Sequence, residues 1–242
     1  MANLRYNMAV PARARMPVYD SALPTKNVQA NTRLRTVQFS WLSRFGELES
    51  QTTNVPDMPL FHMAFNAFAR GTLVQTPQGP VAIEDLEPGK MVETVGGAPC
   101  RINWTGTMAS DATANTGRAS FLYRVTECSY GLGHGKPDLL LGPGARLMRP
   151  SRIGLDTARL DLVSDLVDGQ QIVQVAPRTP VQLYHIALPS HRLIRANDVA
   201  VESFHPGHAA SLAVADDLFG QFVSLFPQVR TLGEFGPLNY LR

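Results

Sequence analysis

From residue 71 to about residue 188 the sequence repeats one pattern, a short run of β-branched, aliphatic or aromatic residues followed by Gly or Pro. The runs include "GTLVQT", "VAIEDLEPG", "CRINWTG", "SFLYRVTECSY", "DLLLGPG", "QQIVQVAP" and "VQLYHIALP". Short strands that return about every 8–12 residues, with turn residues between them, are typical of an all-β domain. The sequence therefore predicts a mostly-β domain over residues 61–206, and 242 residues are enough to bury its core.

Residues 1–60 are rich in Pro, Asn, Thr, Ser and Arg, and they show no sustained apolar period. This composition predicts an extended, irregular arm, and seven Lys or Arg against one Asp in its first 45 residues make it basic. Phe39 and Trp41 stand on alternate positions, and side chains of this size have to be buried on the protein's own core or on a partner. The candidate partner-binding residues are Arg33, Arg35, Phe39 and Trp41.

Within residues 207–242 apolar residues recur at steps of three and four, which predicts one amphipathic helix packed on the β domain. Gly220 lowers the helix propensity of this segment, and Pro227 marks the expected end. The apolar positions are Leu212, Val214, Leu218, Phe222, Leu225 and Phe226.

The N-terminal residues do not form a secretion signal, because arginines occupy the stretch where an apolar run is needed. No stretch reaches the roughly 18 apolar residues that span a bilayer. We therefore expect a cytoplasmic protein without a transmembrane segment, with peripheral association or export without a signal left open. The dispersed arginines of the arm favour a protein partner over nucleic acid.

The histidines near the end of the β region could suggest a metal site. They lack the tight spacing of a motif such as HExxH, so we expect structural or solvent-facing histidines, no metal and no cofactor. Cys100 and Cys128 lack the CxxC spacing of zinc or redox sites. The histidines and the acidic residues between them are His185, His191, Asp198, Glu202, His205 and His208.

Three blocks stand in a fixed order: "AFARGTLVQTPQGPVAIEDLEPG" from residue 67, "DLLLGPGARLM" from residue 138 and "LYHIALPSHRLIRANDVAVESFHPG" from residue 183. Together with "CRINWTG", they resemble the Hint domain, the self-processing module of hedgehog proteins and inteins, in its bacterial free-standing form. The resemblance covers about residues 65–206. It implies a compact domain of short curled strands, with the arm and the C-terminal helix outside it.

The chemistry that the resemblance implies is an acyl shift, in which a Cys, Ser or Thr side chain attacks the carbonyl just before it. The nucleophile position falls on Ala67, and a methyl group has no lone pair to donate. The Ser/Thr and the His of the family's middle motif align with Gly142 and Ala145. The step therefore lacks its nucleophile and the His that would protonate the departing amine.

The late positions of the family also differ. Its Asp aligns with His185, and the terminal His-Asn pair of inteins aligns with Val201 and Glu202. His191 is the one functional family position that is retained, and we expect it to be a hydrogen-bonding residue of the core.

We interpret the chain as a catalytically inactive Hint-like domain without catalytic residues, serving as a protein-binding or structural accessory subunit. The arm and the helix would dock onto a larger partner. The alternative is an enzyme, with self-processing or residual peptide-bond cleavage at Ala67. A hydrolase-like activity of His191 with a nucleophile from elsewhere also stays open.

Overall fold

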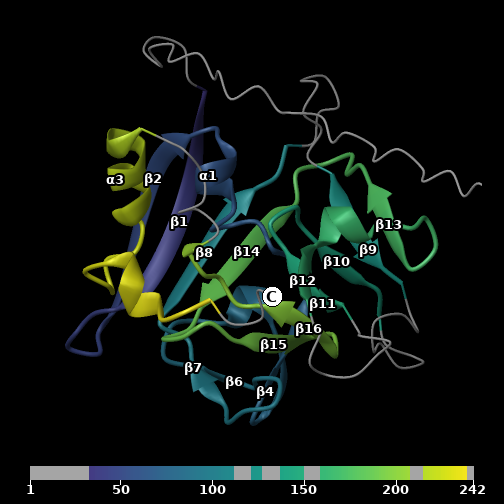
Figure 1. Cartoon of the computed structure of the whole chain (residues 1–242), viewed down its shortest axis with the longest axis horizontal. Helices are drawn as coiled ribbons and strands as arrows, with labels where there is room; N and C mark the ends of the chain where they lie inside the picture. The colour runs from purple at the N-terminus through teal and green to yellow at the C-terminus, as the bar shows by residue number, and fades with distance from the viewer. Residues whose placement is uncertain (1–32, 112–120, 127–136, 150–158, 208–214, 239–242) are drawn as a thin grey trace, which may run out of the picture. The chain divides into compact units, whose positions relative to one another are not determined.

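The computed structural model describes residues 33–111, 121–126, 137–149, 159–207 and 215–238. Within these residues antiparallel strands dominate, which confirms the mostly-β prediction (Figure 1). The larger sheet has eight strands. In spatial order they are β13 (Ile172–Val175), β9 (Leu122–Val125), β10 (Leu139–Leu141), β3 (Phe68–Ala69), β14 (Gln182–Ala187), β8 (Trp104–Ala109), β1 (Leu34–Leu42) and β2 (Leu48–Pro56).

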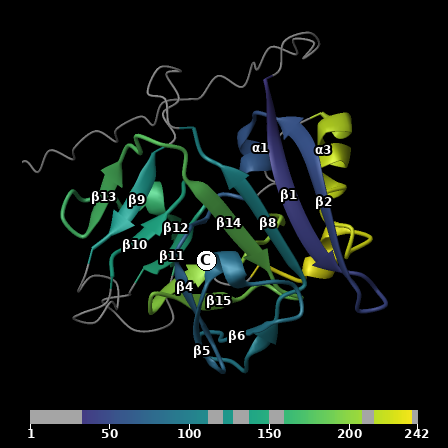
Figure 2. The same ribbon diagram turned by 180° about the vertical axis from the view of Figure 1, so that it is seen from behind.

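A second sheet of six strands and a two-stranded ribbon complete the β structure, as seen from behind in Figure 2. The second sheet runs in the order β12 (Arg159–Leu162), β11 (Arg146–Arg149), β16 (Val199–Glu202), β15 (Leu193–Ala196), β4 (Leu73–Thr76) and β5 (Gly79–Ala82), and the ribbon pairs β6 (Met91–Val92) with β7 (Cys100–Arg101). The helical elements are α1 (Pro59–His62), α3 (Asp216–Val223) and the 3-10 turns η1 (Ile83–Asp85), η4 (Val163–Leu166) and η5 (Leu232–Phe235).

The buried side chains form two cores. The first core lies in the region of the resemblance and is aliphatic, with Val74, Leu141 and Ile186 among its members. The second, which we call the aromatic core, combines side chains from both ends of the described chain with side chains of β8 and β14. Its aromatic members are Phe39, Trp41, Phe61, Phe65, Trp104, Phe204, Phe222, Phe226 and Phe235.

Residues 34–56 require a correction to the expected arm, because they form the antiparallel hairpin β1–β2 at the edge of the larger sheet. β1 also pairs with β8, in a register that places Phe39 opposite Gly106. Phe39 and Trp41 point into the aromatic core, so the protein's own core buries them. The polar sequence of β2, "LESQTTNVP", carries no apolar alternation, which is why the pattern did not predict its strand. Residues 1–32 lie outside the described residues.

The proposed partner-binding arginines are also engaged within the chain. Arg35 donates from Nη1 to Asp111 Oδ1 at 2.8 Å and from Nε to Asp57 Oδ1 at 3.2 Å. Arg33, whose side chain is about half exposed, donates to the same Asp111 oxygen at 3.0 Å. Arg33 and Arg35 therefore tie the hairpin to the rest of the domain, and Phe39 and Trp41 are buried in its core. Partner binding by these four residues stays a prediction.

The C-terminal helix α3 packs on the aromatic core through Phe222, as the apolar spacing predicted. The chain continues to Leu225, whose carbonyl accepts a hydrogen bond of 2.8 Å from the Trp104 indole Nε1. Figure 1 shows α3 beside β1 and β2. The hairpin near the start of the described chain and the helix near its end therefore lie on the same side of β8. Gly220 does not interrupt the helix, and the predicted positions Leu212 and Val214 lie outside the described residues.

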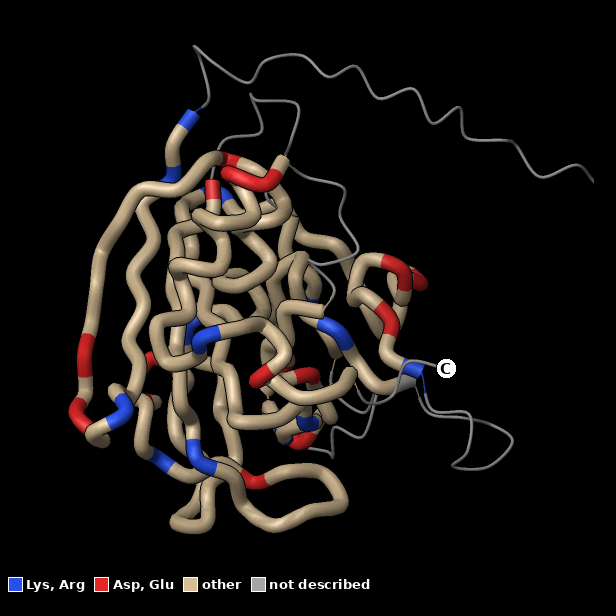
Figure 3. The backbone as a smooth tube through the Cα atoms, turned by 60° about the vertical axis from the view of Figure 1, so that its left-hand side comes forward, with Lys and Arg blue, Asp and Glu red and all other residues tan. Residues whose placement is uncertain are grey.

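Charged residues of both signs are spread along the described part of the chain, and Figure 3 shows Lys and Arg interspersed with Asp and Glu. Across the part of the chain that the structure describes, no helix is long and apolar enough to cross a bilayer. The same residues contain no group of three or more His, Cys, Asp and Glu side chains arranged to hold a metal ion.

Candidate functional site

The candidate site is built around the Asn66–Ala67 peptide bond, the junction that the resemblance singles out. β3 follows it and lies between β10 and β14, so the junction is part of the larger sheet. The Ala67 N–H donates to the Tyr184 carbonyl at 3.0 Å, and the Asn66 carbonyl accepts from the Gly144 N–H at 3.2 Å. These two hydrogen bonds hold the peptide on both sides. Because Ala67 is fully buried, the peptide is also shielded from water.

The "GPGA" turn after β10 packs directly on this peptide. The Gly142 N–H donates to the Ala67 carbonyl at 2.9 Å, and a Cβ at Gly142 would lie 2.1 Å from the Asn66 carbonyl oxygen. A Cβ at Gly144 would lie 2.1 Å from Asn66 Oδ1. Glycine is therefore required at residue 142, where the close atom belongs to the backbone, whereas a side chain at residue 144 would displace the Asn66 amide. Ala145 beside them is fully buried.

This close approach predicts a strong effect of one added methyl group. Gly142→Ala is expected to lower the free energy of unfolding by about 1–3 kcal/mol, because the clash is with backbone that cannot rotate away. The matched control is Gly220→Ala in α3, where nothing lies within 4 Å of the added Cβ; this change is expected to stabilise by about 0.5–1 kcal/mol. Urea unfolding of both variants measures the contrast, and equal effects would contradict it.

His191 is anchored by Glu202. The His191 ring is buried, and its Nε2 lies 2.6 Å from Glu202 Oε1, so the ring N–H donates to the carboxylate. The other carboxylate oxygen of Glu202 lies 3.6 Å from Arg146 Nε. Glu202 ends β16 and Arg146 begins β11, and these neighbouring strands bring the two charges together.

Two other histidines of the predicted cluster lie near this pair. The ring centroids of His205 and His191 are 5.2 Å apart, and His185 and His205 line the same pocket as Glu202. His185 lies on β14 between the rings of Phe68 and Phe204, and its Nδ1 accepts the Ile186 N–H at 3.1 Å. His205 Nδ1 accepts the Gly207 N–H at 3.0 Å, so its Nε2 carries the proton and donates to the Gly236 carbonyl at 2.9 Å. The His205 ring therefore holds the C-terminal segment, while His208 lies outside the described residues.

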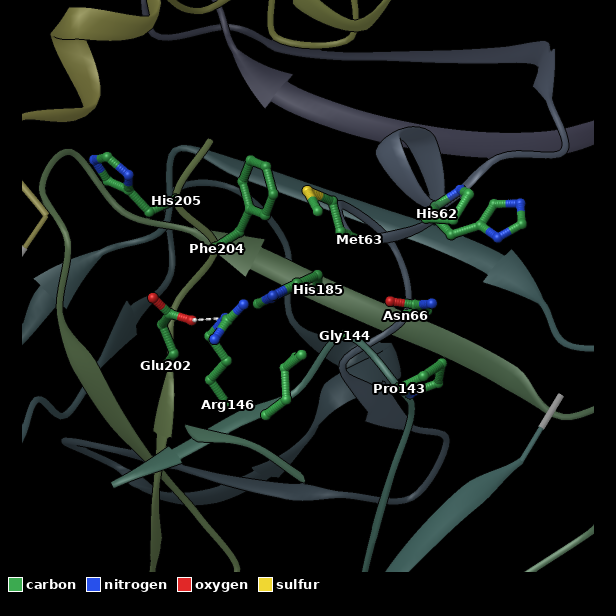
Figure 4. A pocket seen from close by; sticks show the side chains of 12 residues that line it. His62, Met63, Asn66, Pro143, Gly144, Arg146, His185, Glu202, Phe204 and His205 are labelled. Carbon is green, nitrogen blue, oxygen red and sulfur yellow. Dashed lines mark ion pairs between the residues drawn. The ribbon is translucent and has the colours of Figure 1, made fainter. Parts of the chain in front are cut away.

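A pocket of about 310 Å³ opens beside the junction, and Figure 4 shows its lining. Arg146 and Glu202 lie at one side of this pocket and Asn66 at the other. A neighbouring pocket of about 410 Å³ shares Asn66 and His62 with it. The first pocket is lined by Pro59, His62, Met63, Asn66, Pro143, Gly144, Arg146, Leu162, His185, Glu202, Phe204 and His205.

His62 separates the two pockets and was not singled out from the sequence. Burial lowers the pKa of its imidazole below the ordinary value, while the neighbouring Asp57 carboxylate acts in the opposite direction. His62 Nε2 lies 2.9 Å from Asp57 Oδ1, so the ring is tied to the same aspartate that holds Arg35. The ring forms part of the wall between the pocket and the charged base of the hairpin.

The lining of the pocket mixes polar and apolar side chains. No Ser, Thr, Cys or Lys is among the described residues that line it, while its carboxylate and imidazoles are groups that also act as nucleophiles in other sites. The lining combines an apolar wall with a guanidinium, a carboxylate, imidazoles and an amide. Pockets with a few convergent polar groups on apolar walls are typical of ligand sites.

The fold and the junction together define a β domain of short antiparallel strands built around a buried peptide bond. Residues 66–208 match the family model described as the Hint domain, and this match spans more than half of the chain. The chain therefore belongs to the Hint domain family, as the resemblance predicted.

Solved structures with a similar fold include inteins. A bacterial intein-like domain from Clostridium thermocellum is 14% identical, with 58% of this chain and 99% of that chain covered and a TM-score of 0.43. The gp41-1 intein is 17% identical, with 57% of this chain and 98% of that chain covered and a TM-score of 0.39. The comparison with curated proteins found no match.

Proposed function

We propose that this Hint domain does not cut its own chain and acts as an accessory binding domain. The observation that carries the proposal is the fully buried methyl group of Ala67, at a junction that requires a nucleophile. The N–H of the same peptide donates to the Tyr184 carbonyl, within the pairing of β3 with β14. This hydrogen bond ties to β14 the nitrogen that would have to depart.

The packing around the junction supports the same proposal. Ala145, at the position of the family's His, is fully buried in the same core as Ala67. Replacing it by a much larger imidazole would overpack this core. A side chain at Gly142 would collide with the Asn66 carbonyl. The turn at residues 142–145 would carry the family's proton donor. Its packing leaves no space for a side chain at Gly142 or for an imidazole at Ala145.

The described residues before the junction pack into the fold. β1 contributes Phe39 to the aromatic core, α1 contributes Phe61, and Phe65 of the core lies between α1 and β3. A cut at residue 67 would divide this core without releasing a separate domain. An accessory role therefore fits an uncut chain, and a protein partner would bind the pocket rather than the hairpin face.

Ala67→Cys tests the proposal by restoring a nucleophile of nearly the same size. We expect the variant to remain full length during days of incubation with dithiothreitol, because the thiol has no proton donor placed for the departing amine. Ala64→Cys is the matched control, since Ala64 is equally buried three residues upstream. Intact mass spectrometry reads both variants. A fragment beginning at residue 67 in Ala67→Cys alone would mean that the missing nucleophile, and not the packing of the turn, keeps the chain uncut. The same fragment from the original protein, measured beside the variants, would contradict the proposal.

A further inference from the structure

Arg146 has guanidinium donors that no described residue uses. The side chain is 21% exposed and lines the 310 Å³ pocket, yet among the described residues its one partner is Glu202, 3.6 Å from Nε. A guanidinium has five N–H donors in a planar fork, which matches a carboxylate in a bidentate geometry. Glu202 is itself held by His191 at 2.6 Å, so it cannot turn fully toward the guanidinium.

Asn66 supplies a second unused group at the opposite side of the pocket. The residue is 7% exposed, and its buried Oδ1 has no hydrogen-bond donor among the described residues. A buried acceptor without a donor is costly unless a bound group satisfies it. Figure 4 shows Asn66 across the pocket from Arg146 and Glu202.

Between these two groups the lining is largely apolar, and it includes the His185 ring (Figure 4). Met63 and Phe204 line one side, and Leu162 and Pro143 add further apolar surface. A volume of about 310 Å³ lies at the lower end of the range for sites of small ligands, about 300–1,000 Å³. The site therefore suits one apolar group of modest size, flanked by an anion and a hydrogen-bond donor.

We propose that this pocket binds a carboxylate carried on an apolar group, with an N–H or O–H that donates to Asn66 Oδ1. Arg146 binds the carboxylate, and the walls bury the apolar group. A small free acid and the C-terminal residue of a peptide share this chemistry. The inference rests on the proposed function, since a domain that does not process its own chain can use the pocket for an external ligand.

The test compares acids with their neutral amides on the full-length protein by isothermal titration calorimetry. The probes are N-acetyl-phenylalanine and its amide, and the tripeptide acetyl-Ala-Ala-Phe with a free or an amidated C-terminus. We expect at least one acid to bind about tenfold or more tightly than its amide, as charged hydrogen bonds allow. If only N-acetyl-phenylalanine is preferred over its amide, the ligand is a small free acid. If only the tripeptide acid is preferred over its amide, the ligand is the C-terminal residue of a peptide.

Two variants assign the preference to the pocket. Arg146→Gln is expected to abolish the preference for acid over amide, and Glu202→Gln to strengthen acid binding, because it removes the competing negative charge and keeps an acceptor for His191. Thermal melts establish that each variant is folded, and intact mass on the same samples tests self-cleavage separately. Equal binding of acid and amide by the original protein would overturn the proposal, as would a preference unchanged in folded Arg146→Gln.

Discussion

Phe39→Ala is expected to lower the free energy of unfolding by about 3–5 kcal/mol, the usual cost of removing a buried phenylalanine ring. Phe39 is 2% exposed, and its ring lies 6.3 Å from that of Trp104 and 5.6 Å from that of Trp41. Its loss leaves a cavity where the hairpin packs on β8. A change this large would establish that the segment before the junction belongs to the folded domain.

The matched control is Phe45→Ala, the same substitution on the same hairpin. Phe45 is 76% exposed at the turn between β1 and β2, so we expect a change of less than about 0.5 kcal/mol. Urea unfolding followed by tryptophan fluorescence is suitable, because both tryptophans, Trp41 and Trp104, belong to the aromatic core. Equal and small effects of the two substitutions would mean that the hairpin does not contribute to the stability of the domain.

Glu202→Ala is expected to be comparably damaging, at about 3–5 kcal/mol, the cost of breaking a buried ion pair by removing one partner. The Glu202 carboxylate accepts from His191 and neutralises Arg146. Without it, a buried ring N–H and a largely buried guanidinium lose their partner. Such a loss would support a structural role for the retained His191.

Glu87→Ala is the control for this substitution, because Glu87 is exposed and is expected to change stability by less than about 0.5 kcal/mol. Glu202→Gln separates hydrogen bonding from charge, since it keeps an acceptor for His191. It should therefore cost less than Glu202→Ala in urea unfolding. If all three variants unfold like the original protein, the carboxylate does not anchor the site.

Much of the β domain could be predicted, because local patterns reflect local structure. The run "GTLVQT" contains β4, and "VQLYHIALP" contains β14. The three-and-four spacing of the C-terminal segment coincides in part with α3, which ends before Leu225 and Phe226. Of the hairpin over residues 34–56, only the first strand was indicated, by the alternation of Phe39 and Trp41. The outer strand β2 is polar on both faces, so alternation gave no signal, and its stability comes from pairing with β1.

The site was predicted only in part, because several of its residues come together only through the tertiary fold. The motif order singled out Ala67, Gly142 and Ala145, and the structure places all three around one peptide bond. Arg146 and His62 were missed, because an arginine beside a buried alanine and a histidine in a short helix carry no pattern of their own. They become significant only when β11, β16 and α1 meet around the pocket.

The central claim, that the chain remains uncut at residue 67, is tested most directly by the intact mass of the purified protein itself. The protein is held at neutral pH with and without dithiothreitol, and samples are denatured before measurement so that associated fragments separate. We predict a single mass, that of residues 1–242, unchanged over days. The growth of fragments 1–66 and 67–242 with time would contradict the account.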